Sequence, residues 1–174
     1  MSSPSLPLVY LAGPDVFRYD AAEYFRTLSR ACDEFGMEAL APFDAAPNPG
    51  TPKQIFEKNM QMLRRADGMI ANLAPFRGAE PDAGTVFEVG AAHALGIPVV
   101  AYGVGAGSYS DRVRALYGAI ADEKGVLRDC AGQLVEDWGL PMNLMLACAV
   151  PIEDCPAGAL RKLRGLLLAG RLNS

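Results

Sequence analysis

Histidine is almost absent from this sequence, in which His93 is the only one among 174 residues. Zinc sites commonly take His ligands, and a Ser–His–Asp triad needs a His as its base. A single His offers few ligands for a zinc site and only one candidate base for such a triad. We predict that the protein holds no metal ion. If the protein is an enzyme, we expect carboxylates to serve as its acids, bases or nucleophiles.

Cysteine is scarce as well, and no two of the four cysteines form a CxxC pair. Most of their sequence neighbours are apolar. We interpret them as free cysteines that pack in the interior of a protein from a reducing compartment. They are Cys32, Cys130, Cys148 and Cys155.

A basic surplus, a long apolar run and a nucleotide-binding fingerprint are also missing. The formal net charge is −4, which argues against a nucleic-acid partner. No apolar run reaches the length of a membrane span, and residues 1–7 do not look like a signal peptide, so we predict a cytoplasmic protein with no membrane partner. The glycine-rich segment 103–107 lacks the order of a dinucleotide fingerprint. We therefore expect no cofactor, and we interpret 103–110 as a flexible loop that could serve as a lid.

The length and composition fit a single domain over residues 1–174, with 1–6 as a disordered tail. Short apolar runs alternate with amphipathic segments, which predicts a three-layer α/β/α sandwich with a parallel sheet. A flavodoxin-like strand order of 2-1-3-4-5 fits this alternation. The predicted strands are 6–12, 37–41, 68–73, 97–102 and 150–152. The predicted helices are 21–35, 53–66, 84–95, 111–121, 140–149 and 157–168, with a loop at 15–19 and a small hairpin from 126–127 and 134–135.

In this strand order the ligand crevice lies at the carboxyl ends of strands one and three, where the order reverses. Gly13, Pro14 and Asp15 follow strand one. The segment 76–90 follows strand three and enters the next helix. We expect both segments to face one crevice.

Two carboxylates stand at the start of that helix, and each has two interpretations. Glu88 is a helix-start acid that satisfies the helix dipole, or an ionised and poorly solvated nucleophile. Asp82 is an N-cap, or a polar group that binds a substrate hydroxyl or donates a proton near Glu88. Two carboxylates flanking one cleft is also the arrangement that cleaves glycosidic bonds.

Other polar residues near the crevice have similar pairs of interpretations. Arg77 is a solvated loop tip or a substrate contact. Tyr10 and Gly13 mark a strand end with a turn, or a place where a ligand approaches the backbone closely. Asn143 is a helix cap or a substrate contact.

Together these motifs resemble the nucleoside 2-deoxyribosyltransferase family, over residues 8 to about 152. The resemblance rests on VYLAGP at 9–14, NLAPFRG at 72–78, EPDAGTVFEVG at 80–90 and GLPMNLML at 139–146. The FRG loop looks closest to the purine-preferring branch. The family implies a flavodoxin-like fold and the transfer of a 2-deoxyribosyl group between nucleobases, a reaction of nucleoside salvage.

The resemblance also implies roles for individual residues. Glu88 matches the nucleophile that forms a covalent deoxyribosyl intermediate, and Asp82 matches a contact to the sugar hydroxyls. Asn143 matches a residue that a neighbouring subunit contributes to the sugar, so the resemblance implies a homo-oligomer. The candidate substrate-binding residues are Tyr10, Gly13, Asp15, Asn59, Arg77, Gly84, Asn143 and Met145, and all but Asn59 lie in or next to the motifs.

One position departs from the family. Many members carry an Asp in the helix before strand three, whereas the matching residue here is Asn59. An amide can hydrogen-bond a base but cannot readily act as a general acid. Two alternatives stay open beside transfer: an N-glycoside hydrolase of deoxynucleosides or deoxynucleoside 5′-monophosphates, and a nucleoside-sensing domain without catalysis.

Overall fold

The protein is described by a computed structural model, in which residues 5–42 and 50–172 are placed. A parallel five-stranded sheet forms its centre, with the strand order β2-β1-β3-β4-β7. Because β7 is the fifth strand of this sheet, the predicted order 2-1-3-4-5 is confirmed. The strands are β2 (Glu38–Leu40), β1 (Leu8–Ala12), β3 (Gly68–Asn72), β4 (Val99–Tyr102) and β7 (Ile152–Glu153). Most of the predicted tail lies outside the described residues.

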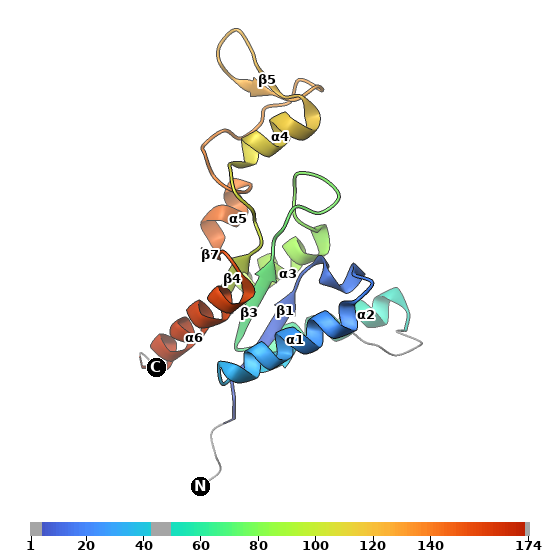
Figure 1. The fold of residues 1–174 in the computed structure, drawn as a ribbon, viewed down its shortest axis with the longest axis vertical. Coiled ribbons are helices and arrows are strands. Elements are labelled where there is room, and N and C mark those ends of the chain that lie inside the picture. The colour runs from blue at the N-terminus through green and yellow to red at the C-terminus, as the bar shows by residue number, and fades with distance from the viewer. Residues whose placement is uncertain (1–4, 43–49, 173–174) are drawn as a thin grey trace.

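Alternate residues of a strand point to opposite sides of the sheet, and here both sides are apolar. Helices cover both faces. Tyr10 and Met69 pack with helices α2 (Pro52–Arg65), α3 (Ala83–Ala94) and α5 (Leu144–Ala149). Val9 and Ile70 pack on the other face with α1 (Ala21–Glu34) and α6 (Pro156–Leu172). The three-layer prediction is therefore confirmed, and Figure 1 shows α1 and α6 lying across one face of the sheet.

The strand register brings the loops of interest to one edge. Ala12 at the end of β1 pairs with Ala71, and Asn72 at the end of β3 pairs with Tyr102 of β4. The segment after β1 forms a short 3-10 helix, η1 (Pro14–Phe17), where a loop was predicted. Pro14 favours this turn because its φ angle is already helical and its missing N–H is not needed there.

Beyond this edge projects an arm, which we define as residues 109–137 and which stands at the top of Figure 1. It contains α4 (Tyr109–Tyr117), β5 (Ile120–Ala121) and β6 (Leu127–Arg128) around a small apolar core that also includes Ala79. The Tyr117 hydroxyl accepts a hydrogen bond of 3.2 Å from the backbone N–H of Ala79. The arm is therefore anchored to the loop that precedes Asp82.

Three local predictions were wrong. The helix predicted over 111–121 spans Tyr109–Tyr117, because Gly118 adopts a left-handed conformation. The small hairpin is confirmed, by contrast, since Arg128 bridges Leu134 in antiparallel fashion and the Val135 N–H donates to the Leu127 carbonyl at 2.9 Å, while β6 also pairs with β5. The helix predicted from 140 begins at Leu144. Only Cys32 is buried, while the other three cysteines are exposed, so the packing interpretation fails for them. No helix in the described part of the chain is long and apolar enough to cross a membrane.

Candidate active site

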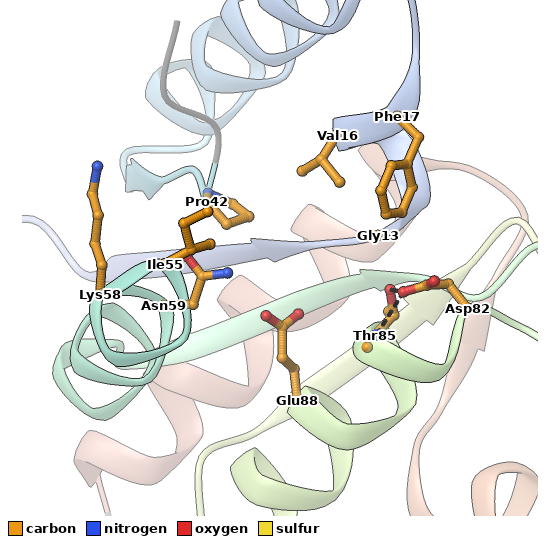
Figure 2. A pocket seen from close by; sticks show the side chains of 11 residues that line it. Gly13, Val16, Phe17, Pro42, Ile55, Lys58, Asn59, Asp82, Thr85 and Glu88 are labelled. Carbon is orange, nitrogen blue, oxygen red and sulfur yellow. Dashed lines mark hydrogen bonds between the residues drawn. The ribbon is translucent and has the colours of Figure 1, made fainter. Parts of the chain in front are cut away.

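A cavity of about 530 Å³ opens at the carboxyl ends of β1 and β3, between η1, α2 and α3. Figure 2 shows its side chains converging from these elements. It is lined by Gly13, Val16, Phe17, Pro42, Ile55, Lys58, Asn59, Asp82, Gly84, Thr85 and Glu88. This is the place that the strand order predicted for a ligand crevice. A second recess of about 400 Å³, lined partly by Phe56 and Phe87, shares Asn59, Gly84 and Glu88 with this cavity.

Glu88 projects from the second turn of α3 into the cavity (Figure 2). Its Oε1 accepts a 2.7 Å hydrogen bond from the Tyr10 hydroxyl. Burial raises the pKa of Glu88, the hydrogen bond from Tyr10 lowers it, and the charge of Asp82 raises it again, so that the pKa lies above its usual value. No donor among the described residues is recorded for Oε2. The result is a poorly solvated carboxylate with one oxygen fixed and the other available to a ligand, which suits a nucleophile.

The Tyr10 hydroxyl fixes Glu88 from the core side of the cavity wall. Its side chain is fully buried in the core of β1, and it is not part of the cavity lining. Burial and the neighbouring Glu88 charge raise the pKa of the Tyr10 hydroxyl far above its usual range. The hydroxyl therefore stays protonated and acts as a permanent donor to Glu88, behind the cavity wall rather than on it.

Asp82 caps α3 and also lines the cavity. Its Oδ2 accepts hydrogen bonds from the backbone N–H of Thr85 at 2.9 Å and from the Thr85 hydroxyl at 3.0 Å. The N-cap interpretation is confirmed. Because both bonds go to Oδ2, the Oδ1 atom remains for another donor, and the two interpretations of Asp82 are compatible. Gly84, which follows within the same turn, also lines the cavity.

Gly13 forms part of the lining where η1 leaves β1. A Cβ atom at this position would lie 2.8 Å from both the Cβ of Asn72 and Oδ2 of Asp15, which is too close without a shift of the neighbours. Asp15 itself is buried and accepts a 2.8 Å hydrogen bond from Nδ2 of Asn72. Asp15 therefore lies beneath the lining and fixes the start of η1 against β3. Asn72 was not among the predicted site residues.

The aromatic side of the cavity was missed by the sequence analysis. Phe17 lines the cavity and stacks on Phe76, with ring centroids 5.4 Å apart. Arg77, predicted to contact substrate, lies outside the lining and places its guanidinium over both rings. The apolar pair Val16-Phe17, which follows Gly13-Pro14-Asp15, was the available clue. The remaining lining residues that were not predicted are Val16, Pro42, Ile55, Lys58 and Thr85.

Asn143 and Met145 do not line the cavity of their own chain. Asn143 is the N-cap of α5: its Oδ1 accepts a 3.0 Å hydrogen bond from the Met145 N–H, and its Nδ2 donates to Glu136 at 2.9 Å. The capping interpretation is thus confirmed. Met145 is 71% exposed. Substrate contacts by these two residues would have to be made in a neighbouring copy of the chain, and they stay a prediction.

A family model described as nucleoside 2-deoxyribosyltransferase matches residues 9–145. The chain belongs to the nucleoside 2-deoxyribosyltransferase family. The match spans most of the chain and includes Tyr10, Asp82, Glu88 and Asn143. The predicted resemblance is confirmed, and membership in this family is consistent with small-molecule nucleoside substrates. Within the described residues, no group of three or more His, Cys, Asp or Glu side chains is placed to hold a metal ion.

Individual relatives agree with this membership in the nucleoside 2-deoxyribosyltransferase family. The structure is similar to a 2-desoxiribosyltransferase from Leishmania mexicana, with a TM-score of 0.73 and 31% identity over 91% of this chain and 97% of that one. The uncharacterized protein C191.05c of Schizosaccharomyces pombe is 33% identical over 158 residues, 80% of this chain and 75% of that protein. A conserved protein from Enterococcus faecalis, at 18% identity, matches 93% of this chain and 99% of its own with a TM-score of 0.56, and shares the fold.

Proposed function

We propose that this protein transfers a 2-deoxyribosyl group between nucleobases, with Glu88 as the nucleophile. The observation that carries the proposal is the setting of Glu88: it projects into a cavity, one of its oxygens is held by Tyr10, and Asp82 lines the same cavity. A nucleophilic carboxylate needs to be fixed, ionised and only partly solvated. All three conditions are consistent with this geometry.

The chemistry follows a double displacement. An oxygen of Glu88 attacks C1′ of a deoxynucleoside, the C1′–N bond breaks, and its electron pair leaves with the base. This gives a glutamyl ester of deoxyribose. A second base then attacks C1′ from the vacated face with a nitrogen lone pair, loses its proton and releases the Glu88 carboxylate. Two inversions give net retention, as in retaining glycosidases.

The other lining residues fit binding roles in this scheme. The free Oδ1 of Asp82 would accept a hydrogen bond from a sugar hydroxyl. Phe17 would stack against a base, because a purine or pyrimidine ring gains about 1–3 kcal/mol from an aromatic surface. Asn59 lies across the cavity from Glu88 and would hydrogen-bond the base, while water supplies the proton that an amide cannot.

The proposal extends to the assembly and its setting. Asn143 and Met145 lie outside the cavity of their own chain, so we propose a homo-oligomer in which a second copy presents them to the sugar. The substrates would be a purine deoxynucleoside and a free base, exchanged in nucleoside salvage in the cytoplasm. A dimer is the smallest assembly that meets this requirement.

One observation favours a second candidate, an N-glycoside hydrolase. A second recess between α2 and α3 shares Asn59, Gly84 and Glu88 with the cavity. In a single chain this recess leaves a path by which water could reach C1′ of the intermediate. If water rather than a base attacks, the product is free deoxyribose or, from a 5′-monophosphate substrate, its phosphate ester.

One incubation separates these outcomes. The protein is mixed with 2′-deoxyinosine and adenine, and the products are followed by chromatography. Deoxyadenosine with hypoxanthine supports transfer, whereas deoxyribose without deoxyadenosine supports hydrolysis. Absence of both products with either deoxynucleosides or their 5′-monophosphates contradicts the proposed function. The Glu88→Ala variant should be inactive in every case.

A further inference from the structure

The loop after β3 and the turn after β1 are joined by a stack of three side chains. The rings of Phe17 and Phe76 lie 5.4 Å apart and 16° from parallel. The Arg77 guanidinium carbon lies 4.6 Å from the Phe76 centroid and 5.3 Å from the Phe17 centroid. Both distances fall within the range of a cation–π interaction. Phe17 is the only one of the three that also lines the cavity.

Arg77 adopts an unusual backbone conformation to take this place. Its φ of 57° is the only positive value at a residue other than glycine in the described part of the chain. Such a conformation costs about 1–3 kcal/mol at a bulky residue and marks functional sites. Within the described residues, no hydrogen bond or ion pair is recorded for the Arg77 side chain. Its recorded partners are the two aromatic rings.

Phe17 needs such support because it is poorly enclosed. Its side chain is 60% exposed at the end of a four-residue 3-10 helix. An exposed phenylalanine normally exchanges between rotamers on the picosecond to nanosecond scale. The stack with Phe76 and Arg77 restricts the ring at the cavity wall, where Figure 2 shows it beside Val16.

We propose that Arg77 is a positioning residue, which acts through Phe17 and Phe76 to hold the Phe17 ring in place as a stacking surface for a nucleobase. This inference rests on the proposed function. Arg77 would not touch the substrate. Its loss should weaken base binding and leave the displacement at C1′ unchanged, because Glu88 and Tyr10 do not contact it.

The test compares two substitutions at one site. Arg77→Met keeps much of the side-chain length but removes the charge, and Arg77→Lys keeps the charge without the planar guanidinium. Both carry the same backbone cost, since neither is glycine. We expect Arg77→Met to raise the KM for adenine in the transfer reaction about two- to fivefold, the range of an exposed cation–π interaction, with kcat unchanged and Lys intermediate. Arg161→Met, on the exposed surface of α6, serves as the matched control.

Three kinetic results would overturn the inference. The first is a KM for Arg77→Met that equals the wild-type value. The second is a loss that appears in kcat instead of KM. The third is an effect confined to deoxynucleoside 5′-monophosphates, which would show that Arg77 binds the phosphate directly.

A ligand-free measurement separates failure of this inference from failure of the proposed function. The protein is labelled with 4-fluorophenylalanine, and the Phe17 resonance is assigned with Phe17→Leu. In Arg77→Met this resonance should sharpen and move toward the value of the free amino acid, while Arg161→Met leaves it unchanged. An unchanged Phe17 resonance in Arg77→Met refutes the positioning role. If the resonance changes but the protein transfers no deoxyribose, the proposed function is refuted, and with it the role of Phe17 in stacking on a base. Arg77 would then still be shown to hold the Phe17 ring in place.

Discussion

The Tyr10 hydroxyl donates a 2.7 Å hydrogen bond to Oε1 of Glu88, and so links the buried middle of β1 to the cavity-facing side of α3. Burial works against ionisation of Glu88, whereas this bond favours it. The pKa of Tyr10 is raised far above its usual range, so the donor stays protonated under all ordinary conditions. The balance between burial, this bond and the charge of Asp82 sets the pH range in which Glu88 is a nucleophile.

Removing the hydroxyl should therefore shift the pH profile. In Tyr10→Phe the contribution that lowers the pKa of Glu88 is gone, and the pKa rises further. The acid limb of kcat/KM should move to higher pH than in the wild-type protein. Steady-state transfer rates measured across the acid to neutral range check this.

The matched control for Tyr10→Phe is Tyr24→Phe, whose hydroxyl lies 3.3 Å from the hydroxyl of Tyr102 on the opposite face of the sheet. It should leave the acid limb in place. An acid limb that moves to lower pH in Tyr10→Phe, or equally in both variants, would show that Tyr10 does not stabilise the ionised carboxylate.

Glu88 should also cost the protein stability at neutral pH. Its pKa in the folded state lies above the unfolded value, so between the two values the folded protein binds more protons. The free energy of unfolding contributed by this group then falls as pH rises through that window. Glu88→Gln keeps an acceptor for Tyr10 and removes the charge. Its melting temperature should exceed that of the wild-type protein at neutral pH.

The pH dependence of that difference provides the check. Below the ordinary pKa of a glutamate, both forms are neutral and the two melting temperatures should converge. Differential scanning calorimetry at several pH values measures this. A Glu88→Gln variant that melts below the wild-type protein at neutral pH would indicate that the ionised carboxylate makes stabilising contacts, which the account does not contain.

Asp82 has a structural and a proposed catalytic role, and two variants separate them. Asp82→Ala removes the cap of α3 and should cost about 1 kcal/mol of unfolding free energy, the typical effect at an N-cap. Asp82→Asn can still accept from Thr85 and should fold with little loss. We expect transfer activity to fall about tenfold or more in both, the effect of losing a hydrogen bond to a charged group.

Denaturant melts and kcat/KM measured on the same samples give the comparison. Ser108→Ala, which removes the cap of α4 on the arm, is a control for capping alone. Full activity in Asp82→Asn would limit Asp82 to its capping role.

Much of the fold could be predicted because its determinants are local. The buried strands are short apolar runs, and Gly36 and Gly96 stand where helices end. The arm could not be predicted in the same way. Its strands β5 and β6 are two residues each, too short to show a periodic pattern, and the arm is anchored by a hydrogen bond between Tyr117 and Ala79, 38 positions apart.

The site, too, contains contacts that follow from local sequence and contacts that depend on the fold. Asp82 and Glu88 are six residues apart on one element, so their proximity follows from the sequence. The bond from Tyr10 joins residues 78 positions apart, and the stack of Phe17 on Phe76 joins two separate loops. Both depend on the register of β1 against β3. Met145 and Asn143 show the limit of a single chain, because their predicted contacts require a second copy.

A mixing experiment tests whether the site is shared between copies. Glu88→Gln lacks the nucleophile, and Asn143→Ala lacks the group expected to reach the sugar. If sites combine Glu88 of one copy with Asn143 of another, an equal mixture of the two weak or inactive variants, refolded together, should regain about a quarter of the wild-type transfer rate by random pairing in a dimer. Each variant refolded alone is the control. No gain on mixing would contradict a site completed by the partner.

The most direct test of the central claim is capture of the Glu88 ester. The protein is incubated with a deoxynucleoside in the absence of an acceptor base, quenched in acid, digested and examined by mass spectrometry. The account predicts a 2-deoxyribosyl adduct on the peptide containing Glu88, lost when a second base is added before quenching and absent from Glu88→Gln. Base release by the wild-type protein with no adduct on that peptide, or with the same adduct in Glu88→Gln, would contradict it.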